Sequence, residues 1–177
     1  MITTAELAVH IDGRSLTVED VVRVARHGWK VTLDEGSIQA MQRTRDYVEK
    51  LLREKKVVYG LTTGFGKFSD TYISAEDAKA LQLNLIRSHA CGIGRPFAIE
   101  VVRAILLLRI NALALGYSGI RPGVVSLMVE MLNRGVTPVI PEQGSLGASG
   151  DLAPLSHLAL VLVGEGEAYY EGVAMPG

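Results

Sequence analysis

Small residues are concentrated at residues 144–150, where backbone and side chains could both take part in chemistry. The segment reads Gly-Ser-Leu-Gly-Ala-Ser-Gly and is followed by Asp-Leu-Ala-Pro-Leu-Ser-His, which turns apolar in a helix-like pattern. At its centre stands Ala148-Ser149-Gly150, a tripeptide small enough for the chain to fold back on itself. A nucleophile elbow would need glycine two residues after the serine, and Asp151 stands there instead. The segment is therefore a candidate for backbone chemistry as well as side-chain chemistry.

Two further glycine-rich segments fail the tests for phosphate and dinucleotide binding. Gly60 to Gly66 is one residue too long for a phosphate-binding loop, and Phe68 stands where Ser or Thr must hold magnesium. The pair at residues 92 and 94 lacks the third glycine of a dinucleotide fingerprint, since Phe97 occupies that place. The four histidines are far apart and there is one cysteine, so the sequence predicts no metal site and no internal disulfide.

Composition limits the class of protein. The chain of 177 residues has 18 basic and 19 acidic residues, a balance that excludes a nucleic-acid footprint. The N-terminus has no basic start followed by an apolar run, and the most apolar stretches, 101–114 and 152–163, are too short or too broken by charge to span a bilayer. We therefore expect a soluble, cytoplasmic protein with no nucleic-acid or membrane partner.

Start and stop signals predict a mainly α protein with minor β structure. Thr17 and Asp20 form an expected capping box, and Gly28 and Gly135 are expected helix stops. The expected helices span residues 17–26, 37–54, 74–91, 98–115, 122–133 and 151–163. The expected strands are a hairpin around Asp12-Gly13 (residues 9–16), a short strand at 57–59 and a closing hairpin at 168–174. Residues 136–150 are expected to be irregular.

Three segments together carry a family resemblance. Residues 59–66 (Tyr-Gly-Leu-Thr-Thr-Gly-Phe-Gly), residues 84–90 (Asn-Leu-Ile-Arg-Ser-His-Ala) and residues 144–157 resemble the histidine and aromatic amino-acid ammonia-lyases. The resemblance covers essentially the whole chain and implies the N-terminal part of the fumarase/aspartase-like helical fold. It implies an N-terminal α-rich domain (residues 1–115) carrying the tyrosine loop, and the start of a central helical domain (residues 116–177) carrying the Ala-Ser-Gly segment.

The resemblance implies an unusual cofactor made from the chain itself. In the family the amide nitrogen matching Gly150 attacks the carbonyl matching Ala148, two waters leave, and the residue matching Ser149 supplies a methylene, giving 4-methylidene-imidazol-5-one. Glycine suits this closure because a side chain would obstruct it. Asp151 would assist the dehydration or orient the loop, at the positive end of the following helix. No metal or external cofactor is implied.

The remaining site residues also follow from the resemblance. Tyr59 matches the family's catalytic base, and its loop contains the glycines Gly60, Gly64 and Gly66, which would let the loop close and open. His89, with Ser88 beside it, matches the position that contacts the substrate side chain. The pair Ser88-His89, together with residues 66–70, is most similar to the histidine-specific branch, which eliminates ammonia from L-histidine to give trans-urocanate. Thr62 differs, because bacterial members of that branch usually have Asn there.

Two alternatives to a histidine-specific enzyme stay open at this stage. The chain is shorter than members of the family, whose sites are built from several subunits of a homotetramer, so we expect the missing part to carry further substrate-binding groups. The 177-residue chain would then be a catalytically silent fragment that self-associates through unpartnered helices and does not form the electrophile by itself. Thr62 instead favours a tyrosine or phenylalanine lyase or aminomutase.

Overall fold

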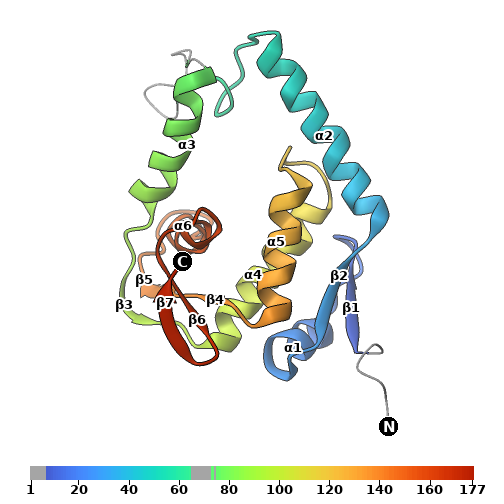
Figure 1. Ribbon diagram of the computed structural model, residues 1–177, viewed down its shortest axis with the longest axis vertical. Coiled ribbons are helices and arrows are strands. Elements are labelled where there is room, and N and C mark those ends of the chain that lie inside the picture. Colours follow the sequence, from blue (N-terminus) through green and yellow to red (C-terminus); the bar gives the residue numbers. More distant parts are fainter. Residues whose placement is uncertain (1–6, 65–72, 74) are drawn as a thin grey trace.

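The computed structural model describes residues 7–64, 73 and 75–177 (Figure 1). This described part is mainly helical with minor β structure, as predicted, and its strands form three small sheets. Its helices are α1 (Val18–His27), α2 (Glu35–Arg53), α3 (Ala75–His89), α4 (Ile99–Ala114), α5 (Pro122–Arg134) and α6 (Leu152–Leu162). Its strands are β1 (Ala8–Ile11), β2 (Lys30–Leu33), β3 (Ile93–Pro96), β4 (Thr137–Pro138), β5 (Pro141–Gln143), β6 (Glu167–Tyr170) and β7 (Val173–Pro176).

Local signals set the ends of the helices. The capping box at Thr17 is present, because its hydroxyl accepts the Asp20 backbone N–H and the Asp20 carboxylate accepts the Thr17 backbone N–H. Gly28 and Gly135 end α1 and α5 in left-handed conformations, with φ of 68° and 75°. Asp34 caps α2, which therefore begins two residues earlier than predicted.

The predicted hairpin around Asp12-Gly13 is wrong. β1 pairs in parallel with β2, with Val9 opposite Val31, and α1 is the crossover between them. The Asp12 carboxylate accepts hydrogen bonds from the backbone N–H groups of Arg14 and Ser15 at 2.7 and 2.8 Å. These N–H groups are therefore bonded within a local turn and not to a neighbouring strand. Asp12-Gly13 does form a turn, as the sequence indicated, but the segment that follows the turn is helix α1 and not a second strand of a hairpin.

The predicted strand at residues 57–59 is also wrong. The Val58 carbonyl accepts the backbone N–H groups of Leu61 and Thr62 at 3.1 and 3.0 Å, which bends the chain into a turn. The predicted closing hairpin is confirmed as β6 and β7, with the turn at residues 171–172. The segment expected to be irregular, residues 136–150, holds the short strands β4 and β5, which pair with β6 and β3.

The core is built around α4, which packs against α1 and α5. Leu106, Leu107 and Ile110 of α4 are almost completely buried. Arg103, about half-buried, donates to the carbonyls of Val24 (2.8 Å) and Leu132 (3.1 Å) and so joins the C-terminal turns of α1 and α5. Residues before and after position 115 share this core, and the division into domains 1–115 and 116–177 stays a prediction.

Candidate active site

The Ala148-Ser149-Gly150 segment lies in an exposed turn between β5 and α6. Gly147 and Gly150 have φ of 92° and 67°, a left-handed region that a residue with a side chain rarely adopts. The Ser145 hydroxyl donates to the Gly150 carbonyl and so closes the turn. A Cβ at Gly150 would lie 2.5 Å from the Ser145 Oγ, so a larger residue would displace the Ser145 side chain, and the positive φ independently favours glycine.

Ser149 and Asp151 are in direct contact. The Ser149 Oγ donates to the Asp151 Oδ1 at 2.6 Å, and this bond is the main reason that the pKa of the Asp151 carboxyl lies below its ordinary value. The positive charge of Arg109 makes a smaller contribution in the same direction. Asp151 occupies the N-cap of α6, where its carbonyl accepts the Leu155 N–H but its side chain bonds no backbone N–H of the helix. Its carboxylate is therefore ionised near neutral pH and directed at the hydroxyl that the family chemistry removes.

These residues fit the electrophile that the resemblance implies. A bend is already present at residues 147–149, Ala148 and Ser149 are exposed, and no side chain stands on Gly150. The serine hydroxyl is held by a carboxylate that could exchange a proton with it. The turn at the tripeptide and the carboxylate beside its serine are therefore compatible with ring closure between residues 148 and 150.

Ser88 and His89 form the last turn of α3. The His89 Nδ1 lies 2.9 Å from the Leu85 carbonyl oxygen and 3.0 Å from the Ser88 Oγ, and the Ser88 hydroxyl itself donates to the same carbonyl at 2.9 Å. Because a carbonyl oxygen only accepts, this geometry favours the proton on Nδ1 in the neutral ring. Nε2 is then the acceptor that the half-buried ring would offer to a substrate.

The end of α3 meets the start of the glycine-rich turn through Gly92. Its backbone N–H donates to the His157 Nε2 at 3.0 Å, and the burial of His157 lowers the pKa of its imidazole. A Cβ at Gly144 would lie 2.9 Å from the Gly92 Cα, so the two glycines allow close contact of the two segments. β3 and β5 continue this contact with Ile93 opposite Gln143. His157 therefore ties α6 to the segment after α3.

Tyr59 lies in a separate turn, with its side chain 63% exposed. The Thr62 hydroxyl accepts the Val58 N–H (2.8 Å) and donates to the Lys56 carbonyl (2.6 Å). The Thr63 hydroxyl accepts the Gly60 N–H at 3.2 Å. Both threonines are almost fully buried, at 2% and 1% exposure, and so brace the turn from inside.

Of the three glycines predicted for the tyrosine loop, the structure describes Gly60 and Gly64. Gly60 has φ of 70° and lines a pocket of about 720 Å³ with Leu61, α2 and residues 118–121. Gly64 is buried. Gly66 lies outside the described residues. The expected opening and closing of the loop therefore stays a prediction.

The structure brings only some of the predicted site residues together. Ser88 and His89 end α3 near β3, and β3 pairs with β5 just before the Ala148–Gly150 turn. Figure 1 shows the segment after α2, which holds Tyr59, at the opposite end of α3 from β5 and α6. Within one chain, Tyr59 and the candidate electrophile therefore do not form one site.

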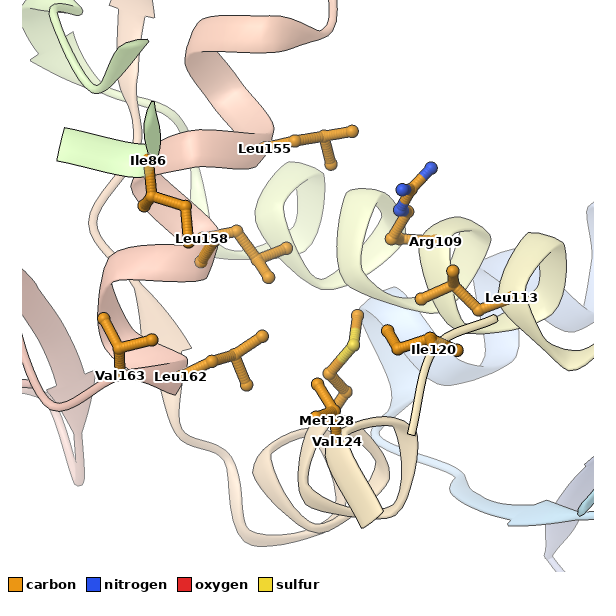
Figure 2. A pocket seen from close by; sticks show the side chains of 11 residues that line it. Ile86, Arg109, Leu113, Ile120, Val124, Met128, Leu155, Leu158, Leu162 and Val163 are labelled. Atoms are coloured by element: carbon orange, nitrogen blue, oxygen red, sulfur yellow. The ribbon is translucent and has the colours of Figure 1, made fainter. Parts of the chain in front are cut away.

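Sequence reasoning missed three residues around these turns: Ser145, Arg109 and the bracing role of Thr62. A hydroxyl five residues before a required glycine was a usable signal for Ser145. Arg109 could not be found, because it comes from α4 and acts on Asp151 across the fold. It borders a mainly apolar pocket of about 280 Å³ between α3, α4, α5 and α6, and none of the described site residues lines that pocket (Figure 2).

The described residues hold neither a metal-binding cluster nor a membrane-spanning helix. Within residues 7–64, 73 and 75–177, no group of three or more His, Cys, Asp or Glu side chains is placed to hold a metal ion. None of the helices in this described part is both long enough and apolar enough to cross a bilayer. The single cysteine, Cys91, is exposed.

Comparison with known proteins gives consistent matches. Residues 16–177 match the family model described as aromatic amino acid lyase. The histidine ammonia-lyase of Caldanaerobacter subterraneus subsp. tengcongensis is 58% identical over 169 residues, which are 96% of this chain and 33% of that protein. The chain thus spans about a third of the length of this curated relative.

Solved structures show the same fold. Tyrosine aminomutase from Streptomyces globisporus matches with a TM-score of 0.87 and 40% identity, covering 96% of this chain and 32% of that one. Histidine ammonia-lyase from Trypanosoma cruzi matches with a TM-score of 0.86 and 37% identity, over 96% and 32% of the two chains. The described helices and small sheets are therefore those of ammonia-lyase and aminomutase structures, and the chain belongs to the aromatic amino acid lyase family.

Proposed function

We propose that this chain is part of a histidine ammonia-lyase, which eliminates ammonia from L-histidine to give trans-urocanate. The observation that carries the proposal is the exposed Ala148-Ser149-Gly150 turn, with the Ser149 hydroxyl 2.6 Å from the Asp151 carboxylate. The choice of histidine is supported by the 58% identity to the Caldanaerobacter histidine ammonia-lyase. A cytoplasmic location fits the single cysteine and belongs to the same proposal.

The chain's own residues would divide the work between binding and proton transfer. The 4-methylidene-imidazol-5-one ring formed from Ala148, Ser149 and Gly150 would supply an electrophile that makes the substrate amine a better leaving group. His89, protonated on Nδ1, would accept a hydrogen bond at Nε2 from the imidazole N–H of the substrate. Tyr59 would remove the β-hydrogen once a positive environment stabilises its phenolate.

The separation of Tyr59 from the Ala148–Gly150 turn supports a site shared between subunits. The two regions lie at opposite ends of α3 in one chain, so a complete site needs Tyr59 from a neighbouring copy (Figure 1). This agrees with the homotetramer that the family resemblance implied. A small amino-acid substrate bound between subunits would touch groups from at least two chains.

A tyrosine or phenylalanine lyase or aminomutase is the second candidate. Its support was Thr62, together with the 40% identity to the Streptomyces globisporus tyrosine aminomutase. In this chain, however, Thr62 is only 2% exposed. Its hydroxyl accepts the Val58 N–H and donates to the Lys56 carbonyl. A side chain turned into its own loop is a weak determinant of substrate choice, so the histidine proposal is favoured.

Self-association as a catalytically silent fragment is the third candidate. An apolar pocket bordered by Arg109 lies between α3, α4, α5 and α6 (Figure 2), and Leu108 of α4 is 51% exposed. Apolar surface of this kind favours a partner. Size-exclusion chromatography of the 177-residue chain tests it, and a concentration-independent monomer would contradict it.

The enzymatic proposal is tested with a hybrid protein. The whole 177-residue chain replaces the matching third of the Caldanaerobacter enzyme, and the hybrid is assayed for urocanate formation from L-histidine and for product from L-tyrosine and L-phenylalanine. We expect activity on L-histidine, with the intact relative as the positive control. A folded hybrid that prefers L-tyrosine would overturn the choice of histidine, and one inactive on all three would overturn the proposed reaction.

A further inference from the structure

The turn that carries the proposed electrophile is closed by a side chain with no assigned role. Ser145 stands before the Ala148-Ser149-Gly150 tripeptide, and its hydroxyl donates to the Gly150 carbonyl. The contact is close, because a Cβ at Gly150 would lie 2.5 Å from the Ser145 Oγ. One hydrogen bond thus joins the start of the turn to the end of the tripeptide.

The two ends of this turn are also fixed from outside. At the N-terminal end, Gly144 packs against Gly92, whose N–H is held by His157, and β5 pairs with β3. At the C-terminal end, the Asp151 carbonyl accepts the Leu155 N–H in the first turn of α6 at 3.0 Å. Between these anchors the exposed residues 145–149 and the partly buried Gly150 are held in their bend mainly by the Ser145 bond and by the left-handed φ of Gly147 and Gly150.

We propose that Ser145 is a positioning residue for ring closure: by holding the Gly150 carbonyl it keeps the Gly150 nitrogen bent back toward the Ala148 carbonyl carbon. The proposal rests on the proposed function, since it concerns how the electrophile is made. Without the Ser145 bond, Gly150 can rotate about its own dihedrals and residues 148 and 150 can move apart, which lowers the fraction of chains poised to cyclise.

The reaction that Ser145 would promote balances without an oxidant. The Gly150 nitrogen forms a bond to the Ala148 carbonyl carbon, and the Ala148 oxygen leaves as water with one hydrogen from each of the amide nitrogens of residues 149 and 150. The second water takes the Ser149 hydroxyl and its Cα hydrogen and leaves the methylene. Ser145 donates its hydrogen bond throughout and is not consumed.

The test measures ring formation directly rather than activity alone. The hybrid described above is made by cell-free synthesis, translation is stopped, and the mass of the peptide containing residues 144–157 is followed with time for a loss of two waters. We expect Ser145→Ala to cyclise roughly five- to tenfold more slowly, the factor expected from the loss of one neutral hydrogen bond. Ser145→Thr keeps the hydroxyl and should cyclise at nearly the unmutated rate.

Controls separate this proposal from the proposed function and from misfolding. Ser126→Ala, at an exposed serine of α5, should cyclise as the unmutated hybrid does. Activity per mole of ring should be unchanged in Ser145→Ala, because the hydroxyl acts before catalysis. If Ser145→Ala cyclises at the unmutated rate, or Ser145→Thr is as slow as Ser145→Ala, the role of Ser145 is overturned while the proposed function stands. If the unmutated hybrid folds and never loses two waters, both fail.

Discussion

Two turns of this protein are held by hydroxyl groups in nearly the same way, yet they differ in exposure. In the Tyr59 turn, the hydroxyls of Thr62 and Thr63 bond backbone groups and are almost completely buried. In the Ala148–Gly150 turn, the hydroxyls of Ser145 and Ser149 bond a carbonyl and a carboxylate and are exposed. The buried pair serves the fold, whereas the exposed pair is available for reaction.

The difference shows how burial decides what a hydroxyl group can do. Removing a buried hydroxyl leaves its backbone partners without solvent to replace it, so the cost appears in stability. Removing an exposed hydroxyl leaves partners that water can satisfy, so the cost appears only in chemistry that needs that oxygen. Thr62 and Ser149 are therefore expected to separate stability from function when each is substituted.

The largest expected effect is that of Ser149→Ala in the hybrid enzyme. Without the Ser149 hydroxyl no methylene can form, and covalent assistance to the departing amine is lost, so activity should fall by on the order of a thousandfold or more. The free energy of unfolding should change by less than about 0.5 kcal/mol, since the residue is exposed. Turnover and urea denaturation measure the two. A large loss of stability would show that the turn is structural.

The 177-residue chain by itself should keep the mass calculated from its sequence. Ala148 and Ser149 are exposed in it, so their peptide groups remain hydrated, and losing two waters is then opposed by the surrounding solvent. Intact-mass spectrometry of the isolated chain tests this directly. A mass lower by two waters would mean that the bonds from Ser145 and to Asp151 suffice for ring closure.

Thr62→Val should have the next largest effect, on stability. Valine keeps the shape of threonine but leaves the Val58 N–H and the Lys56 carbonyl without their partner, at a cost of about 1–3 kcal/mol. Thr62→Ser retains the hydroxyl and should cost clearly less. Urea denaturation of the three proteins measures both changes. Equal losses for Val and Ser would place the role of Thr62 in its methyl group instead.

Much of the fold could be predicted because its signals are local. The capping box at Thr17, the glycine stops at Gly28 and Gly135, and the closing hairpin all depend on residues within a few positions of one another. The parallel pairing of β1 with β2 could not be predicted from Asp12-Gly13, because the turn signal does not say whether a strand or a helix follows it. Pairing partners that are distant in sequence are decided by packing.

The candidate site was predictable to the same extent. Ser149 and Asp151 are two residues apart, and the family resemblance already placed both in the site, although it did not predict their hydrogen bond. The influence of Arg109 on Asp151 and the contact of Gly92 with His157 join elements far apart in the chain, so no local pattern announced them. Thr62 was interpreted as a sign of substrate choice, and the structure instead shows its hydroxyl bonded within its own turn.

A smaller effect distinguishes two glycines of the exposed turn. In Gly147→Ala the new Cβ meets nothing within 4 Å. The variant should lose only about 1 kcal/mol of stability, because alanine is strained at the positive φ of this position. Gly150→Ala adds a close contact with the Ser145 Oγ and should cost more. Adding Ser145→Ala should reduce the extra cost of Gly150→Ala and leave Gly147→Ala unaffected, which a double-mutant cycle by urea denaturation measures. Strict additivity of Gly150→Ala with Ser145→Ala would contradict the contact.

The smallest effect concerns pH at the base of the same turn. Burial lowers the pKa of His157, so the unfolded chain takes up a proton near the ordinary value of 6.5 while the folded chain resists it until a lower pH. The stability that depends on neutral His157 is therefore complete above that value and decreases as the pH falls toward the folded pKa, where protonation removes the acceptor of the Gly92 N–H. His157→Gln keeps an acceptor that does not titrate. Urea midpoints at about pH 7.5 and 5.5 should therefore fall further for the unmutated chain than for this variant. Equal decreases for the two proteins would show that groups other than His157 cause the pH dependence of stability.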